Sequence, residues 1–242
     1  MILLVVEGKD EKDEIKDTIS SFLTITNSES EIVVFGTSIF ELYDYLKDDP
    51  YFDLVSLLVA EKKLVLPKGK TSKTAFSEKY LVFDFEPKYQ KYSDEKIISL
   101  QNYFNNETEN GKLYINYPTF ESLYDMNALP DKRYLTSKIE LTDFEASEYK
   151  HKVYSSSFCN HRPIKNSYQL LQIAVLNYLK IKSIIACEVN PEQYQETLLN
   201  KQITSKTKDD TIFIINTLSL FPYDYSDDMQ TKIKRKAIRL NS

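Results

Sequence analysis

The chain has 242 residues, which is enough for one large domain or two small ones. Hydrophobic residues make up 42% of it and charged residues 28%, a balance that excludes both a disordered chain and a membrane-embedded one. With only 4 Gly and 8 Pro it is neither collagen-like nor a flexible linker. A formal net charge of -5 argues against a small basic coat protein for nucleic acid.

The charge is unevenly distributed along the chain. Residues 1–60 carry 13 acidic and 4 basic side chains, whereas the remaining residues have a net charge of +4. An acidic metal site beside a surface for an anionic polymer would give this pattern, and chance gives it about as often, so the charge alone leaves both interpretations open. The C-terminal segment 230–242 has no acidic residue and five basic ones, Lys232, Lys234, Arg235, Lys236 and Arg239.

Cysteine content and the N-terminal segment predict the compartment. Two cysteines are too few for a disulfide framework. The start MILLVVEGKDEKDE lacks the basic residues and the cleavage site of a signal peptide. No run approaches the roughly 18 apolar residues of a membrane-spanning helix. We therefore expect a cytoplasmic protein with no membrane partner.

The first half of the sequence alternates apolar, β-branched runs with amphipathic segments. This order predicts parallel strands joined by helical crossovers. An exposed loop is expected over 66–78. The expected strands are 2–6, 31–35, 79–85 and 111–116, and the expected helices are 10–23, 38–47, 51–60, 93–104 and 120–126.

After about residue 127 the pattern becomes mainly helical. Helices are expected over 145–153 and 164–181, and from Pro191 to about residue 199. The apolar run 211–220 fits a strand or a buried helix, and we assign it as a helix because it adjoins other helices. The expected architecture is an α/β domain, residues 1–126, with a parallel sheet flanked by helices, and a helical domain, residues 127–242, packed on it.

Acidic residues follow the ends of several predicted strands. Glu7 follows the first strand, and Asp84 and Glu86 end the third. Because alternate residues of a strand point to the same side, Asp84 and Glu86 should face Glu7 at the carboxyl edge of the sheet. Three carboxylates that converge need a cation, and hard oxygen ligands suit Mg²⁺ or Mn²⁺. The competing interpretation is that these acids simply lie at exposed strand ends.

These motifs resemble those of the Toprim fold found in topoisomerases, primases and the OLD and RloB-like phage-defence nucleases. The resemblance covers about residues 1–126 and rests on VVEGKDE after the first strand and FDFE at the end of the third. The family pattern is Glu-Gly after strand one, matched by Glu7-Gly8, and Asp-x-Asp after strand three. Here Glu86 stands where the family has its second Asp.

The resemblance implies an activity and a fuller ligand set. It implies a metal-dependent endonuclease that hydrolyses DNA or a structured RNA such as tRNA in antiviral defence by abortive infection, often beside a partner ATPase. The stretch NYPTFESLYD is similar to a segment of Toprim-like defence nucleases in which Glu121 would match a metal-binding Glu. On this basis Glu7, Asp84 and Glu86 would be catalytic and would bind metal, and Asp10 and Glu121 would hold a second ion.

Basic residues are the candidates for nucleic-acid contacts. Lys9 or Lys88 could neutralise a phosphate, and Lys234, Arg235 and Lys236 could follow a phosphate backbone. A homodimer would unite two such basic tails. Several tyrosines near the acidic motifs could stack on unpaired bases, although half-buried tyrosines are the commoner case.

Two alternatives remain open from sequence. The chain could be a non-catalytic Toprim-like module that binds and regulates a partner ATPase, an interpretation that the departure from the family motif at Glu86 favours. Phosphate-binding motifs such as GxxxxGK[ST] are absent, so the chain is not expected to be an ATPase itself. A zinc site is a weaker alternative, because the spacing of its four candidate ligands is not a standard one and Cys187 has the neighbours of a core residue. These ligands are His151, Cys159, His161 and Cys187.

Overall fold

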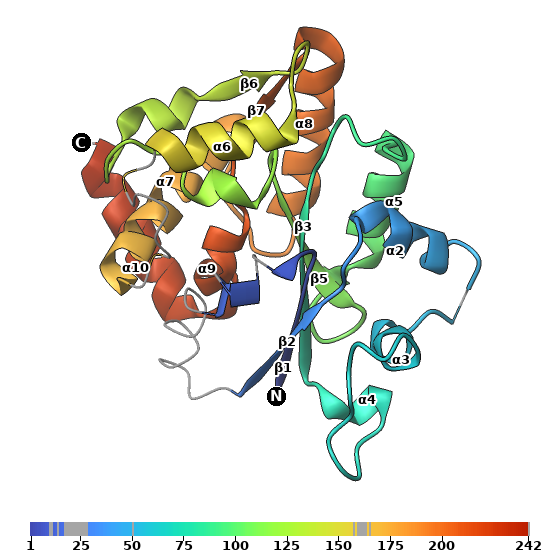
Figure 1. The fold of residues 1–242 in the computed structure, drawn as a ribbon. Helices are drawn as coiled ribbons and strands as arrows, with labels where there is room; N and C mark the ends of the chain where they lie inside the picture. The colour runs from blue at the N-terminus through green and yellow to red at the C-terminus, as the bar shows by residue number, and fades with distance from the viewer. Residues whose placement is uncertain are drawn as a thin grey trace. The chain divides into compact units, whose positions relative to one another are not determined.

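The computed structural model describes residues 1–9, 12–13, 15–16, 29–49, 51–156, 158, 164 and 166–241 (Figure 1). It forms two compact units, one of Met1–Asp84 with Lys91–Tyr114 and one of Phe85–Gln90 with Ile115–Ser242. The second unit therefore takes in residues that the sequence pattern groups with the first. One reason is that Tyr117 and Ile215 exchange backbone hydrogen bonds of 2.8 and 2.9 Å, which tie the end of the fourth predicted strand to the C-terminal half.

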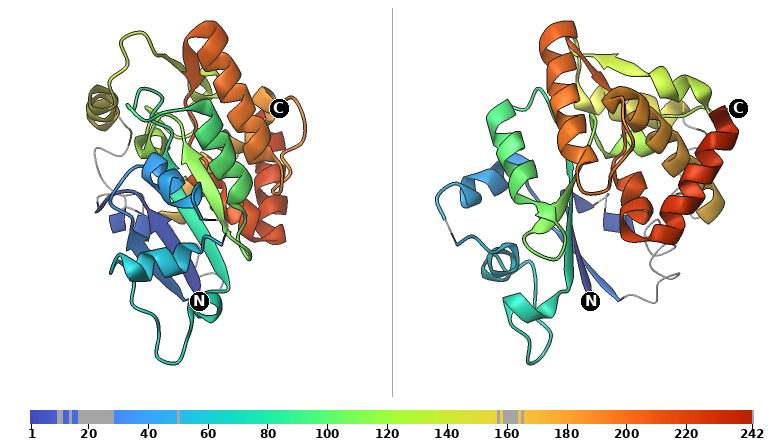
Figure 2. Two further views of the ribbon diagram at one scale, coloured as in Figure 1. Left: turned by 90° about the vertical axis from the view of Figure 1, so that its right-hand side faces the viewer. Right: turned by 180° about the vertical axis from the view of Figure 1, so that it is seen from behind.

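Most of a five-stranded, mostly parallel sheet lies in the first unit, and its strand order is β2-β1-β3-β5-β4. Strand β1 pairs in parallel with both β2 and β3, and β4 pairs antiparallel with β5. Figure 2 shows the strands from two further sides. The bounds are β1 Ile2–Val6, β2 Ser30–Val34, β3 Glu78–Asp84, β4 Asn105–Asn106 and β5 Gly111–Asn116.

The four long strands agree with the sequence prediction, and their burial explains why. Every residue of β1 and β5 is buried, as expected for strands covered on both faces. The two-residue strand β4 is too short to leave a periodic pattern, so the sequence did not predict it.

Four described helices belong to the first unit. Asp53 caps α3 by accepting a hydrogen bond of 3.0 Å from the Ser56 N–H. Helix α4 lies inside the segment 66–78 that was expected to be a loop. The predicted helix 10–23 falls mostly outside the described residues. The bounds are α2 Ile39–Leu46, α3 Leu54–Ala60, α4 Ser72–Ala75 and α5 Asp94–Tyr103.

The second unit is mainly helical and is centred on α7, most of whose residues are buried. It also contains a two-stranded sheet of β6 and β7. The bounds are η1 Phe120–Leu123, η2 Lys132–Thr136, β6 Lys138–Glu140, α6 Ala146–Ser156, α7 Ser167–Ile185, α8 Tyr194–Asp209, β7 Thr211–Phe213, η3 Leu218–Leu220, α9 Phe221–Tyr225 and α10 Asp227–Asn241.

The helix predicted over 211–220 is wrong. Thr211–Phe213 is strand β7, which pairs antiparallel with β6, and only Leu218–Leu220 is helical, as a 3-10 turn. A short apolar run fits a strand and a buried helix equally well. Here the run forms a strand because residues 138–140 pair with it. The short helix expected over 120–126 is likewise a 3-10 turn, η1.

Among the residues that the structure describes, no helix is long and apolar enough to cross a membrane.

Gly111 provides a test of the sheet packing. Its φ is 124°, and a Cβ added there would lie 2.7 Å from Leu81 Cδ1, a buried side chain. Gly69 also has a positive φ, of 79°, but nothing lies within 4 Å of its added Cβ. We expect Gly111→Ala to lower the free energy of unfolding by about 1–3 kcal/mol more than Gly69→Ala does, as measured by urea denaturation. Equal losses in the two variants would contradict this packing.

Candidate functional site

Glu7 is held at the carboxyl edge of the sheet by the strand beside it. The Phe35 N–H donates to the Val6 carbonyl at 2.7 Å, and the Gly36 N–H donates to the Glu7 carbonyl at 2.8 Å. Gly36 has a φ of 83°, which glycine adopts without strain, so the chain turns away at this point. These hydrogen bonds fix the backbone of Glu7, although Glu7 lies just beyond the last residue of β1.

The structure brings Glu7 and Asp84 together. The Asp84 N–H donates a hydrogen bond of 3.3 Å to Glu7 Oε2. Asp84 is the last residue of β3 and is only 2% exposed. The parallel register, with Val6 opposite Val82, puts the two strand ends at the same edge. Both carboxylates thus belong to one edge of the first unit.

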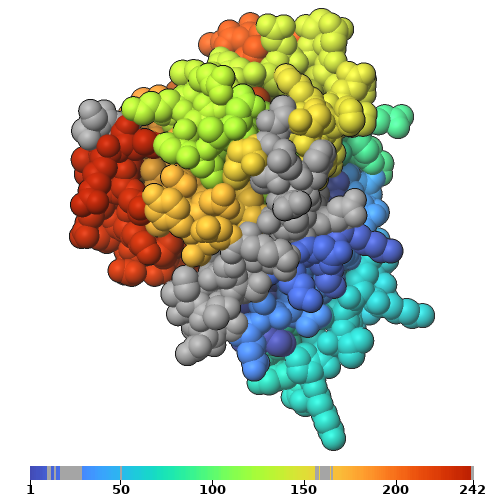
Figure 3. All heavy atoms as spheres, turned by 60° about the vertical axis from the view of Figure 1, so that its left-hand side comes forward, coloured from blue at the N-terminus to red at the C-terminus, as the bar shows by residue number. Residues whose placement is uncertain are grey.

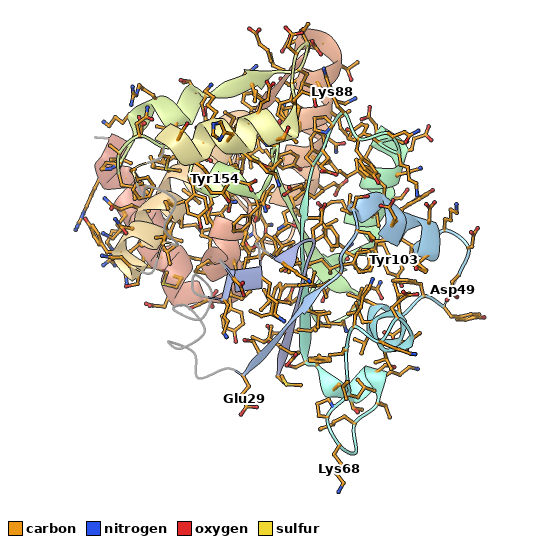
Figure 4. All side chains as sticks on the ribbon, viewed as in Figure 1. Glu29, Asp49, Lys68, Lys88, Tyr103 and Tyr154 are labelled. Carbon is orange, nitrogen blue, oxygen red and sulfur yellow. The ribbon has the colours of Figure 1, made fainter. Side chains whose placement is uncertain are left out.

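Glu86 and Lys88 belong to the second unit. Strand β3 ends at Asp84, and Glu86 has a φ of 41°, so the alternation used to place Glu86 beside Asp84 does not extend to it. The Glu86 N–H donates to the Pro118 carbonyl at 3.4 Å. The Lys88 ammonium, labelled in Figure 4, donates to the Thr142 carbonyl at 2.7 Å, so it anchors its own segment.

Glu121, also in the second unit, is enclosed by neutral and cationic partners. It is 6% exposed, and Thr119 Oγ1 donates to its Oε2 at 2.7 Å. From α6, Lys150 Nζ lies 3.5 Å from the same oxygen, and the Tyr154 hydroxyl donates to Oε1 at 3.4 Å (Figure 4). These contacts stabilise the packing of α6 on η1, a structural role that the sequence did not suggest.

The remaining candidate residues are spread over the chain. Lys9 is exposed directly after the β1 edge, and Asp10 lies outside the described residues. Lys234, Arg235 and Lys236 lie on α10 of the second unit. Lys234 Nζ is 5.6 Å from the centre of the Tyr223 ring, and Lys236 Nζ is 4.9 Å from that of Tyr168.

The zinc alternative gains no support. Cys187 and His151 are exposed, so the expectation that Cys187 is a core residue is wrong, and Cys159 and His161 lie outside the described residues. Within the described part of the chain, no group of three or more His, Cys, Asp or Glu side chains could hold a metal ion.

The chemistry of the donor set at the β1 and β3 ends fits a hard divalent cation. Mg²⁺ is usually bound through one or two carboxylates, several waters and the phosphates of its substrate, and so needs no cage of protein ligands. Glu7 and Asp84 supply two carboxylates from neighbouring strand ends. If a metal binds this edge, these are the two described residues that would hold it.

A buried lysine, Lys180, is a feature that the sequence analysis missed. Its side chain is 0% exposed, and its ammonium donates to the Tyr134 carbonyl, the Ser137 carbonyl and Ser137 Oγ at 2.7, 2.8 and 2.7 Å. It also lies 4.3 Å from the centre of the Tyr134 ring. In the sequence, the sign of this buried group was a lysine inside the mainly apolar helical run LLQIAVLNYLKI.

The environment of Lys180 is electrostatically unusual. Burial lowers the pKa of its ammonium to about 7, and the charge of Asp125 partly offsets this effect. Burial also raises the pKa of Asp125, against the opposing effect of a hydrogen bond of 3.1 Å from the Tyr149 hydroxyl. Since Lys180 has no exposed surface, it has no access to a substrate, and we interpret it as a structural group.

No protein-family model, no curated protein and no solved structure matches this chain. Its function is therefore inferred from its own residues and motifs.

Lys180 predicts a pH dependence of stability. Its folded pKa of about 7 lies below its ordinary value of 10.5. Between these values the unfolded chain binds a proton that the folded chain does not, so stability rises with pH. We expect the titration of Lys180 to increase the free energy of unfolding by up to about 1.4 kcal/mol per pH unit between pH 7 and 9. Lys180→Met should lose this slope in urea denaturation, whereas exposed Lys201→Met should keep it. Parallel curves for wild type and Lys180→Met would contradict the assignment.

Proposed function

We propose that this protein is a metal-dependent nuclease that hydrolyses phosphodiester bonds in DNA or a structured RNA such as tRNA. The observation that carries the proposal is the juxtaposition of Glu7 and Asp84 at the carboxyl edge of a mostly parallel sheet. Open α/β sheets bind their ligands at this edge. Mg²⁺ or Mn²⁺ is the cofactor that carboxylates from two neighbouring strand ends would suit.

Glu7 and Asp84 would contribute to metal binding in different ways. The Asp84 N–H orients the Glu7 carboxylate by donating to its Oε2. Asp84 supplies a second carboxylate from a rigid strand end. A bound divalent ion would polarise a phosphoryl oxygen and lower the pKa of a water molecule. Lys9, exposed two residues after Glu7, would meet the substrate's negative charge.

The motif resemblance supports the same proposal. Glu7-Gly8 and Asp84-Phe85-Glu86 are similar to the acidic motifs of the Toprim fold. The same resemblance supports a role in bacterial antiphage defence, with a partner ATPase. Glu86 and Glu121 stay sequence-based candidates for this site.

The first experiment is a cleavage assay with plasmid, single-stranded DNA and total tRNA in the presence of Mg²⁺ or Mn²⁺. We expect wild type to cut one of these polymers, and Glu7→Gln and Asp84→Asn to lower the rate about 100-fold or more, because each removes a metal-binding charge. Glu31→Gln is the matched control, since this exposed carboxylate lies at the opposite end of the same sheet. Unchanged cleavage by both Glu7→Gln and Asp84→Asn would refute the proposed site.

A second readout separates metal binding from catalysis. A ligand that binds only the folded state at 100 times its Kd stabilises that state by about 2.7 kcal/mol. Millimolar Mn²⁺ should therefore raise the melting temperature of wild type and of Glu31→Gln but not of Glu7→Gln. A protein that neither cuts nor shows this increase would instead favour a non-catalytic module that regulates an ATPase.

A further inference from the structure

A pocket opens between α7 and α10 of the second unit. Its volume is about 200 Å³. Figure 3 shows the red surface of α10 next to the gold start of α7 and the light-green segment near residue 130. The lining residues are Pro130, Tyr168, Gln172, Val175, Lys236, Arg239 and Leu240.

One wall of the pocket is aromatic and apolar. Tyr168, Gln172 and Val175 follow one another at helical spacing on α7 and so share one face of it. The Tyr168 side chain is 57% exposed, so its ring is accessible to a ligand. Lys236 Nζ lies 4.9 Å from the centre of this ring, so an aromatic surface and a cation share one place.

The other wall is cationic and continues beyond the pocket. Lys236 and Arg239 also line a neighbouring hollow on α10, together with Lys232, Arg235, Thr231 and one acidic residue, Asp228. Lys232 and Lys236, like Arg235 and Arg239, are four residues apart, and one helical turn is about 5.4 Å, so the four cations form a band of positive charge along the helix. Within the described residues, Lys232, Arg235 and Lys236 form no ion pair.

We propose that this pocket binds a single-stranded segment of nucleic acid, with one base stacked on Tyr168 and the flanking phosphates along Lys232, Arg235, Lys236 and Arg239. The Gln172 amide, which can both donate and accept, would contact the edge of the base. The combination of a stacking ring with a cationic track is the arrangement by which proteins bind unpaired strands.

Single strands fit this surface better than duplexes or acidic proteins do. A base inside a duplex cannot stack on a protein ring, because its neighbours cover both of its faces. An acidic peptide would satisfy the cations but would have no use for an open ring beside a polar amide. The inference rests on the proposed function for its ligand class and deepens it, by naming an unpaired segment of the substrate.

The test is direct binding without metal. Fluorescence anisotropy with a labelled single-stranded oligonucleotide, in the presence of EDTA, reports on this pocket whether or not the protein cleaves. We expect Tyr168→Leu, which keeps apolar bulk but removes the ring, to weaken binding about tenfold. Lys236→Gln should also weaken binding, and should reduce the slope of log affinity against log salt by about 1.

Matched controls exclude general effects of charge or folding. Tyr51→Leu removes a tyrosine that is 90% exposed in the first unit, and Lys208→Gln removes an exposed lysine of α8. Both should bind the oligonucleotide as wild type does. Circular dichroism should give the same spectrum for all four variants, which would exclude misfolding as the cause of any loss.

Three outcomes would overturn the inference. They are wild-type affinity in Tyr168→Leu, equal affinity of wild type for single strand and blunt duplex, and equal competition by polyglutamate or by vesicles of anionic lipid. A protein that binds the single strand through Tyr168 but never cuts would support this pocket while refuting the nuclease proposal. Metal-dependent cutting by wild type, together with unchanged oligonucleotide affinity in Tyr168→Leu, would support the nuclease proposal while refuting this pocket.

Discussion

The pairing of β1 with a parallel strand on each side is the constraint on which the candidate site depends. Ile2–Val6 is fully buried and runs in register with both β2 and β3. Parallel neighbours end at the same edge of a sheet, so the residues that follow them must meet there. The Asp84 N–H and the Glu7 carboxylate consequently lie in hydrogen-bond contact although 77 positions separate them in the chain.

Local patterns predicted most strands of the first unit because β1, β3 and β5 are largely or wholly buried. Continuous β-branched runs such as ILLVV have few other structures open to them when helices follow and a turn residue ends them. The same patterns could not show where β3 stops. Phe83 and Phe85 are both buried and look alike in sequence, yet the strand ends at Asp84 and the backbone of Glu86 is left-handed. The predicted placement of Glu86 depended on that missing information.

The second unit depends on contacts between distant segments, which a single sequence does not reveal. Asn177 and Lys180 interrupt an apolar helix, and the sequence does show that interruption. It does not show that the Tyr134 hydroxyl donates to Asn177 Oδ1 at 2.7 Å, nor that the Asn216 N–H donates to the same atom at 3.0 Å. Such networks let polar groups lie in a core because each is hydrogen-bonded. Strand β7 was mistaken for a helix for the same reason, since its partner strand lies about 70 residues earlier, at 138–140.

The basic residues of α10 repel one another, and this repulsion lowers the stability of the helix. Lys232 and Lys236, and Arg235 and Arg239, are like charges four residues apart on one helix, and such pairs destabilise a helix by roughly 0.2–0.5 kcal/mol each. Lys180 shows that this chain can hold a basic side chain in its core, by giving it three hydrogen-bond acceptors. The α10 cations Lys232, Arg235 and Lys236 have no comparable ion-pair compensation from the described residues. A bound line of phosphates would reduce their repulsion along the whole helix at once.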